Sequence, residues 1–387
     1  MLKKSTLLIV CLCMFINIQM NCFGDDNLDD EPDYPVFLKQ STSIPNVEAQ
    51  SAIVIDCDTG RVLYEKNAYQ KRPMASTTKI MTAILAIENG NLNDTVSISK
   101  KAAYVGGSTI KLKEGQTYKL VELLYGLLMK SGNDAAIAIA EHIGGDVNKF
   151  VEMMNKKALD INALDTNFVN PHGLDNNNHY TTAYDLANMA RYAMKKPEFA
   201  KIVATKNKSI SGGKVFNNTN EMLFLYQGCN GVKTGFTSKA GRCLVTSVQR
   251  GTENYIAVVL GCETKNKRAQ SSKEILDYAY GNYKRYELVN KEYVYTTTNV
   301  KKGKSKHIET IAKDTIVLPL NEYERSNLYT NEYVEKDLVA PIKKYKKVGY
   351  IEFKVDDKVI AKTDLVVKNS VLQKDFLDYL RDFFCCV

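Results

Sequence analysis

Pro73-Met74-Ala75-Ser76-Thr77-Thr78-Lys79 is the stretch around which the chain is organised, and it runs directly into the apolar segment 80–87. The apolar residues of that segment recur with helical spacing, and Glu88-Asn89-Gly90 is a typical helix stop. The pattern therefore predicts a helix that begins at or near Ser76. Lys79 then lies one turn after Ser76, on the same face of the helix.

This spacing suits nucleophilic catalysis by a serine. A serine hydroxyl is unreactive at neutral pH unless a neighbouring base takes its proton. Lys79 can be that base only if burial and nearby cations lower its pKa, because the neutral amine is required. The free backbone N–H groups at the start of the helix also favour negative charge that develops there during the reaction.

The Ser-x-x-Lys pattern alone is a weak signal, since a helix cap followed by a solvated lysine has the same letters. Two further stretches favour the catalytic interpretation. Ser131-Gly132-Asn133 lies between two apolar helical patterns, and Lys233-Thr234-Gly235 lies in a strand-like run. These three motifs, in this order, are the set found in penicillin-binding proteins and class A β-lactamases.

The composition is that of a globular protein with more than one domain. The chain has 387 residues, which predicts two domains, and its 44% hydrophobic and 25% charged residues are ordinary values. The formal net charge is +8, but no arginine-rich stripe or aromatic-interleaved basic patch indicates nucleic-acid binding. The mild excess of base favours contact with anionic polymers or membrane surfaces.

The first residues have the pattern of an export signal. Residues 1–24 combine Lys3 and Lys4 with the apolar core 7–18, which is typical of a secretory signal peptide, and a retained N-terminal anchor is the alternative. Residues 25–46 are acidic and rich in proline, which predicts a flexible lead-in.

Cysteine and histidine spacing does not indicate a metal site. The cysteines that follow the signal fit no zinc pattern, and the four histidines are scattered along the chain. We therefore expect neither a structural metal nor a cofactor. Export would permit disulfides, but a chain of this size does not need them.

Residues 47–284 are expected to form a catalytic domain. Its strand-like runs are 52–56, 62–64, 230–237, 243–250 and 255–262. If 251–254 is the turn between the last two, Arg250 faces Tyr255 and Cys243 faces Cys262. The absence of a side chain at Gly235 would let a substrate backbone approach the strand closely.

A long polar loop at 168–185 connects to a further helical pattern. Its His172 and Asp175 could be catalytic, but we favour a structural role in which Pro171, His172 and Asp175 fix the loop. The loop contains no glutamate.

The last part of the chain has a different pattern. Residues 287–368 consist of short alternating runs without a helix-length apolar stretch, which predicts a separate all-β domain. Helical spacing returns in 369–387, with one apolar face from Val371 to Val387. The apolar residues of that face are Leu372, Phe376, Leu377, Leu380, Phe383 and Phe384.

From Val47 to Val387 the chain resembles the D-alanyl-D-alanine carboxypeptidases among the low-molecular-mass penicillin-binding proteins. The resemblance rests on the three motifs in their settings, 74–82, 130–136 and 231–237, together with Asn170-Pro171-His172-Gly173-Leu174-Asp175. It implies an α/β (α+β) catalytic domain with an antiparallel sheet flanked by helices, and a C-terminal all-β domain.

The resemblance also implies a role for each motif residue. Ser76 would attack the D-Ala–D-Ala carbonyl with Lys79 as its base, and Ser131 and Asn133 would relay the proton and hold the substrate amide. The remaining positions would serve substrate binding: Lys233, Thr234 and Arg268 at the terminal carboxylate, and the backbone N–H groups of Ser76 and Phe236 at the oxyanion.

Three functions remain open at this point. A carboxypeptidase of peptidoglycan stem peptides, acylated by β-lactam antibiotics, is favoured. A serine β-lactamase shares the motifs, but the class A enzymes deacylate through a glutamate-activated water, and the loop 168–185 has no glutamate. A non-catalytic sensor or scaffold would not need the complete set of catalytic groups.

The resemblance implies a location as well. It predicts an exported protein at the extracytoplasmic face of the cytoplasmic membrane or in the cell wall. Peripheral membrane contact would be made by the C-terminal helix at 369–387. A helix packed on the β domain is the alternative.

Overall fold

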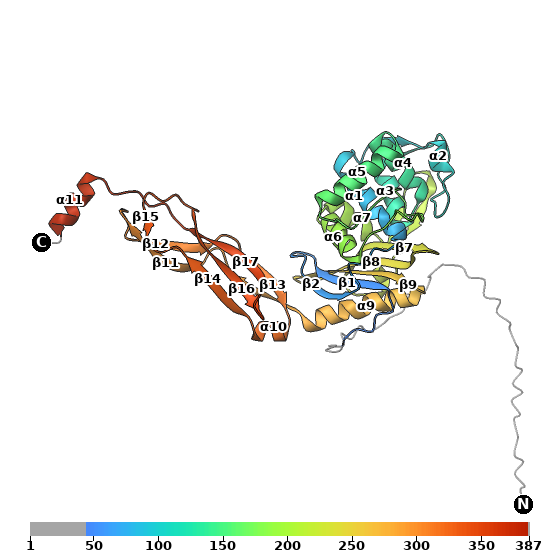
Figure 1. The fold of residues 1–387 in the computed structure, drawn as a ribbon. Helices are drawn as coiled ribbons and strands as arrows, with labels where there is room; N and C mark the ends of the chain where they lie inside the picture. Colours follow the sequence, from blue (N-terminus) through green and yellow to red (C-terminus); the bar gives the residue numbers. More distant parts are fainter. Residues whose placement is uncertain (1–43, 386–387) are drawn as a thin grey trace, which may run out of the picture. The chain divides into compact units, whose positions relative to one another are not determined.

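The computed structural model describes residues 44–385, which form two successive portions (Figure 1). A mixed helix–sheet portion ends with helix α9 (Lys265–Asn282), and a β-rich portion begins with strand β10 (Lys284–Val289). This is the fold class predicted from the sequence. The expected signal at 1–24 and nearly all of the expected lead-in at 25–46 lie outside the described residues.

The first portion is built on a five-stranded sheet in which every neighbouring pair is antiparallel. The strand order is β2-β1-β9-β8-β7, so the last three strands in sequence extend the edge of an N-terminal hairpin. The strands are β1 (Ser51–Asp56), β2 (Val62–Lys66), β7 (Cys229–Thr237), β8 (Gly241–Arg250) and β9 (Glu253–Cys262).

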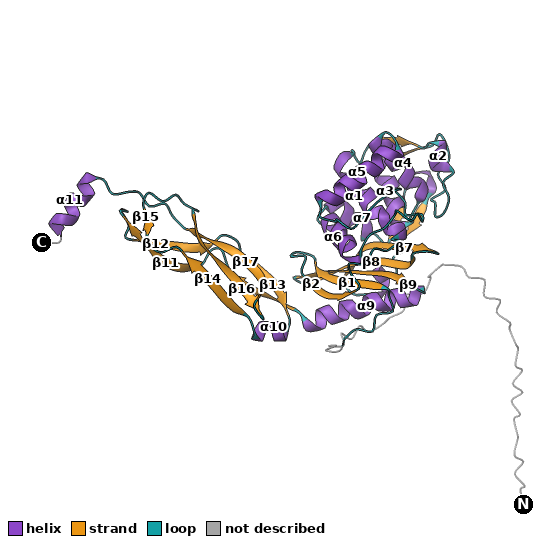
Figure 2. Cartoon of the chain, in the orientation of Figure 1, coloured by secondary structure: helices purple, strands orange, loops and turns teal. Residues whose placement is uncertain are grey.

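Helices cover both faces of this sheet, which explains why its central strands are apolar on both sides (Figure 2). Helix α9 packs on one face, where Met222 of the short helix α8 (Met222–Leu225) joins the same core. The helices on the opposite face are α1 (Lys79–Asn89), α2 (Lys100–Ala103), α3 (Leu120–Met129), α4 (Asn133–Gly144), α5 (Val147–Asp160), α6 (Ala183–Met194) and α7 (Pro197–Val203).

Several of the helices begin where a polar side chain caps the first turn. The side chains of Asp146, Thr182 and Thr264 accept backbone N–H groups at the starts of α5, α6 and α9. Two small hairpins, β3 (Thr95–Ser97) with β4 (Thr117–Lys119) and β5 (Asn207–Ser209) with β6 (Val215–Asn217), complete this portion.

The register expected between β8 and β9 is wrong. The turn is the two residues Gly251 and Thr252 rather than 251–254, so Arg250 pairs with Glu253. A bulge near Leu244 then places Cys262 opposite Arg242. Cys243 packs into the core under α1–α7, whereas Cys262 packs into the core under α9. The two cysteines therefore lie on opposite faces of the sheet and do not face each other.

The second portion is all-β except for a short helix, α10 (Glu322–Ser326), which the sequence pattern did not predict. It contains a two-stranded sheet, β10-β13, and a six-stranded sheet in the order β14-β16-β17-β12-β11-β15. Its remaining strands are β11 (Val294–Lys301), β12 (His307–Ala312), β13 (Ile316–Leu320), β14 (Tyr329–Val334), β15 (Leu338–Val339), β16 (Lys347–Val355) and β17 (Lys358–Val367).

The described chain ends in helix α11 (Phe376–Cys385), which starts later than the expected Val371. Val371 instead forms a β-bridge with Ile342, and Gln373 forms one with Gly303. Because these bridges hold 371–373 in extended conformation, Leu372 lies outside the helix and not on its apolar face.

Candidate active site

Ser76 lies in a single 3-10 turn, Ala75–Thr78, which leads into α1 at Lys79. The turn is stabilised by its own threonines, since the hydroxyls of Thr77 and Thr78 donate to the carbonyls of Met74 and Ala75. Ser76 itself is half-buried. The sequence pattern thus correctly predicted that the serine stands at the start of a helix.

Lys79 is completely buried, and its ammonium group has three acceptors. The Lys79 Nζ lies 2.9 Å from the Ser76 Oγ, 2.8 Å from the Asn133 Oδ1 and 2.6 Å from the His172 carbonyl oxygen. Burial lowers the pKa of Lys79 well below its usual value, and the Lys233 charge lowers it further, while Asp134 opposes the shift. The expected repulsion from Lys233 is present, but loss of hydration is the larger cause.

The second motif connects α3 to α4. Ser131 has a positive φ of 62°, and Asn133 is the first residue of α4. The Asn133 amide has its oxygen on Lys79 and donates through Nδ2 to the Gly106 carbonyl at 2.6 Å. A side chain at Gly107 would meet this amide, since a Cβ there would lie 2.6 Å from the Asn133 Nδ2. The amide is therefore fixed in orientation before any substrate arrives.

The third motif lies on β7 against the start of the serine helix. A Cβ at Gly235 would lie only 3.1 Å from the Ser76 backbone nitrogen, so the strand and the 3-10 turn are in close contact. Lys233 is buried, and its Nζ donates to the Thr234 carbonyl at 2.9 Å. Burial, and secondarily the Arg268 charge, lower the pKa of Lys233 to about 7. Phe236 is half-exposed, with the Arg242 guanidinium 3.9 Å from its ring centroid.

Arg268 lies on α9, is almost fully buried and interacts electrostatically with Lys233. Its guanidinium is also engaged by a residue that the sequence analysis did not single out. Nε and Nη2 of Arg268 both donate to the Oε1 of Glu221, the former at 3.0 Å. No motif signals Glu221, because the ion pair joins distant parts of the chain.

The loop 168–185 supplies backbone atoms to the site. The carbonyl of Pro171 accepts from Thr82 and that of His172 accepts from Lys79. Gly173 has a φ of 92°, and a Cβ there would lie 1.9 Å from the Ala75 carbonyl oxygen, so no other residue fits. Asp175 accepts from Thr237 at the end of β7. These contacts agree with the structural role favoured for Pro171, His172 and Asp175.

The histidine rings of this loop are neutral structural groups. Burial and the Lys79 charge lower the pKa of His172 to about 3, and its Nδ1 accepts from the Leu174 N–H. Burial lowers the pKa of His179 to about 4, and its Nε2 lies 2.7 Å from the Thr78 hydroxyl. Within residues 44–385 neither ring forms a hydrogen bond with Ser76 or Lys79, whereas the His172 backbone carbonyl accepts from Lys79.

The site combines a nucleophile, the buried amine of Lys79 and two further basic side chains. Lys233 acts electrostatically on Lys79, and Arg268 acts on Lys233, which creates a positive environment next to Ser76. Such an environment suits a substrate that carries a carboxylate close to the bond to be broken. Within the described part of the chain, no group of three or more potential metal ligands occurs.

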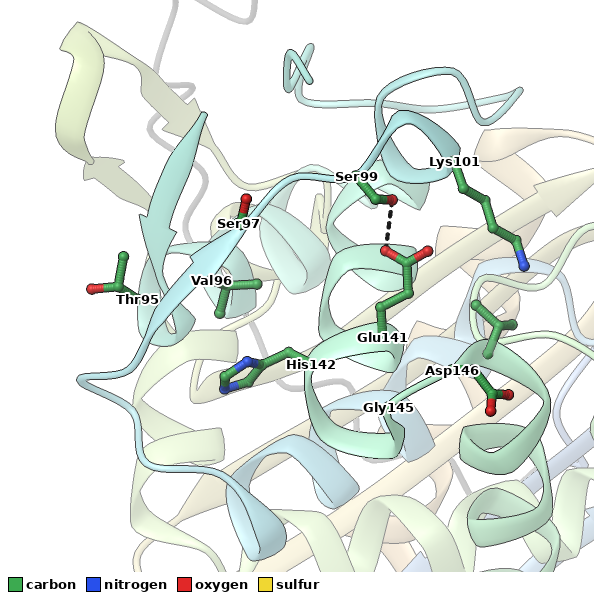
Figure 3. A pocket seen from close by; sticks show the side chains of 10 residues that line it. Thr95, Val96, Ser97, Ser99, Lys101, Glu141, His142, Gly145 and Asp146 are labelled. Atoms are coloured by element: carbon green, nitrogen blue, oxygen red, sulfur yellow. Dashed lines mark hydrogen bonds between the residues drawn. The ribbon is translucent and has the colours of Figure 1, made fainter. Parts of the chain in front are cut away.

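A separate hollow of about 580 Å³ lies between β3 and the helices α2, α4 and α5 (Figure 3). Its rim is polar, and the Ser99 hydroxyl donates to the Glu141 carboxylate inside it. His142 stands on its other side and contacts Asp94 at 3.1 Å. None of the motif residues lines this hollow.

The fold and the site define a class of serine acyl-transferring peptidases, and the chain belongs to the D-alanyl-D-alanine carboxypeptidase family. The family model matches residues 38–264, and the model of the penicillin-binding protein 5 C-terminal domain matches 283–373. The family assignment made from the three motifs is thereby confirmed.

Individual relatives match over nearly the whole chain. The chain is 37% identical to D-alanyl-D-alanine carboxypeptidase DacF of Bacillus subtilis, covering 86% of this chain and 88% of the relative. It is 30% identical to DacD of Escherichia coli, with 97% and 98% covered. Among solved structures, penicillin binding protein 5 from Haemophilus influenzae superposes with a TM-score of 0.77 at 29% identity, covering 86% of this chain and all of that one.

Proposed function

We propose that this chain removes the terminal D-alanine from peptidoglycan stem pentapeptides through an acyl-enzyme on Ser76. The observation that carries the proposal is the 2.9 Å contact between the Ser76 hydroxyl and a fully buried Lys79 whose pKa is lowered. A neutral Lys79 amine takes the Ser76 proton as the oxygen attacks the carbonyl carbon of the D-Ala–D-Ala bond. Family membership supports the substrate class.

The other motif residues stabilise what develops during this attack. The backbone N–H groups of Ser76 and Phe236 receive the oxyanion, and the close approach of β7 at Gly235 to the start of the serine helix supports this assignment. The Asn133 amide holds the substrate amide, and Ser131 passes the proton to the leaving D-alanine amine. Water then hydrolyses the ester on Ser76 and restores the hydroxyl.

The cationic side chains of the site recognise the free terminal carboxylate of the substrate. Lys233 and Thr234 bind the terminal carboxylate from β7, and Arg268 adds a second positive charge from α9. The Arg268 charge acts on Lys233, which supports a shared carboxylate site.

The experiment is release of D-alanine from a pentapeptide that ends in D-Ala-D-Ala, together with mass spectrometry after treatment with penicillin. The purified protein should release D-alanine and gain the mass of one penicillin on Ser76, and Ser76→Ala should abolish both. Penicillin hydrolysis with rapid loss of the adduct and no D-alanine release would instead indicate a β-lactamase. An adduct without either turnover would indicate a sensor.

We also infer that the protein is exported and that α11 attaches it to a membrane surface. The helix exposes several large apolar side chains, among them Phe376 (75% exposed), Phe383 (70%) and Phe384 (72%). Exposure of this apolar face argues against packing on the β portion, and burial in a bilayer interface would stabilise it by about 25 cal/mol per Å². In the described residues no helix is long and apolar enough to cross a membrane.

The acidic side chains of this segment have partners within the protein. Lys304 forms ion pairs with Asp375 and Asp378, and Lys374 pairs with Asp382. Co-sedimentation with liposomes tests the attachment. The full chain should pellet in a largely salt-resistant manner, and a chain that ends at Lys368 should stay in the supernatant. Equal pelleting of both forms would show that the helix is not the anchor.

A further inference from the structure

A second cavity, of about 760 Å³, lies in the β portion, away from every motif residue. Four chain segments line it: the β10–β11 connection, the end of β12, the β15–β16 connection and the end of β17. We call it the lysine cavity because these segments contribute Lys291, Lys313, Lys344, Lys347 and Lys368.

The lysine cavity has an excess of positive charge. Only two acidic residues, Glu292 and Asp364, line it together with the five lysines. Lys347 is paired with Asp364 at 2.6 Å, and Lys368 is paired with Glu309 at 2.9 Å. Lys291, Lys313 and Lys344 carry no ion pair with any described residue (44–385). These three lysines are therefore free of carboxylate partners, and the Lys344 ammonium lies 4.8 Å from the Tyr345 ring centroid.

The backbone that carries these lysines is held by hydrogen bonds between the lining segments. The Lys313 N–H donates to the Asp364 carbonyl at 2.8 Å, and the Lys368 N–H donates to the Glu309 carbonyl at 2.9 Å. The Lys344 N–H donates to the Ser370 hydroxyl at 3.0 Å. Because the segments are tied to one another, the lysines are gathered around a common hollow by the fold and not by chance side-chain positions.

We propose that the lysine cavity binds a segment of a linear polyanion that carries repeated phosphate groups. Lysine ammonium groups act as point charges toward phosphate and do not require a planar ligand. A chain of spaced phosphates can place one charge near each of Lys291, Lys313 and Lys344. Binding would hold the catalytic portion close to anionic polymer without using the active site.

The shape of the site favours a polymer over an anionic bilayer. A bilayer surface is flat, whereas these lysines surround a hollow large enough for a chain segment. Tyr345 is the one large apolar lining residue that is strongly exposed (61%), so the cavity rim lacks a group of side chains that would insert between lipids.

The test measures binding of the full chain to long-chain inorganic polyphosphate over a series of salt concentrations. The cavity variant combines Lys291→Gln, Lys313→Gln and Lys344→Gln. The matched control combines Lys306→Gln, Lys336→Gln and Lys358→Gln, which removes the same charge from exposed lysines outside the cavity. We expect the cavity variant to raise the Kd at least about tenfold and to lower the slope of log K against log salt by about 2 to 3.

Binding of the same proteins to vesicles with and without phosphatidylglycerol is the second measurement. The control variant should bind polyphosphate like the parent chain, and all three proteins should show the same melting temperature and the same D-alanine release from a short peptide. Failure of the parent chain to bind polyphosphate would overturn the proposal. If both variants lose polyphosphate binding equally, the effect is one of net charge only, which would contradict the proposal. If the cavity variant loses vesicle binding but keeps polyphosphate binding, the lysines bind a bilayer instead.

Discussion

The Lys79 Nζ lies 2.9 Å from the Ser76 Oγ, and no water or second side chain needs to intervene between the base and the nucleophile. The same nitrogen contacts the Asn133 Oδ1 and the His172 carbonyl oxygen. The Asn133 and His172 oxygens accept N–H groups and orient the amine, and burial and Lys233 disfavour its charge, so that the lone pair of the neutral amine can accept the Ser76 hydroxyl proton. Geometry and electrostatics thus support the same role for Lys79.

This arrangement predicts a bell-shaped dependence of kcat/KM on pH. The proposed mechanism requires Lys79 without its proton, and its pKa lies well below its usual value. It also requires the charge on Lys233, whose pKa is about 7, because a neutral amine binds the substrate carboxylate weakly. Both limbs belong to the coupled pair and not to one residue alone. Initial rates on a D-Ala-D-Ala peptide, measured at low substrate concentration, provide the profile.

The Lys79→Arg variant tests whether the activity requires a base at this position or only a positive charge. Arginine keeps a positive charge but does not lose it at accessible pH, so it cannot act as the base. We expect turnover to fall by about 10²–10⁴-fold at every pH. Substantial turnover in this variant would show that another group takes the Ser76 proton.

Lys233 should lower the stability of the fold, because its charged side chain is buried. Its pKa is about 7 when folded and 10.5 in its usual state, so between these values the unfolded chain binds more protons. Stability contributed through this group therefore rises as pH increases from about 7 to 10.5. Lys233→Met keeps an unbranched chain without charge. We expect this inactive variant to melt at a higher temperature than the parent at pH 6, by a margin that shrinks toward pH 10.

Thermal unfolding followed by circular dichroism at several pH values measures this margin. Lys239→Met is a control, because Lys239 is an exposed lysine near the end of the same strand. A margin that does not change with pH would show that the charge on Lys233 is not the cause.

The motif residues and the elements that carry them could be predicted from the sequence, since each motif adjoins a strong apolar pattern. Ser76 and Lys79 are one helical turn apart, and Lys233 lies on a buried strand. The contacts of the loop 168–185 could not be predicted, because a backbone carbonyl such as that of His172 has no signature in the sequence. The close packing of Gly173 on Ala75 likewise depends on the folded positions of two distant segments.

The predicted register between β8 and β9 is wrong for a local reason. The prediction places four residues in the turn where the chain uses two, and this shifts every later pair. The bulge near Leu244 then altered the pairing at the far end of the strands, which alternation of residue types does not indicate.

The cysteines in β8 and β9 should be free thiols in the purified protein. Cys243 and Cys262 are both buried and free, and they pack on opposite faces of the sheet. A disulfide would require both side chains to point into the same space. Burial also raises the pKa of Cys243 to about 11 and that of Cys262 to about 12, so neither forms a reactive thiolate at neutral pH. Mass spectrometry after alkylation of the unreduced, denatured protein should show both residues alkylated, and a linked peptide pair would contradict the described register.

Glu221 should act as a positioning residue for Arg268. Its Oε1 accepts from both Nε and Nη2 of Arg268, which fixes the plane of the guanidinium and leaves Nη1 without a described partner. The pair is largely buried, with side-chain exposures of 5% for Arg268 and 18% for Glu221. If the free edge of Arg268 receives the substrate carboxylate, Glu221→Gln should loosen that edge and raise KM about tenfold while kcat changes little.

A peptide whose terminal carboxylate is converted to an amide distinguishes this role from a general loss of structure. The amide lacks the charge that Arg268 would bind, so its kcat/KM should be similar for the parent chain and for Glu221→Gln. Glu198→Gln, which removes the same charge from an exposed position on α7, should leave both substrates unaffected. A fall in KM for the carboxylate peptide would mean that Glu221 competes with the substrate for Arg268. An equal loss of kcat/KM on both substrates would mean that the ion pair serves the fold alone.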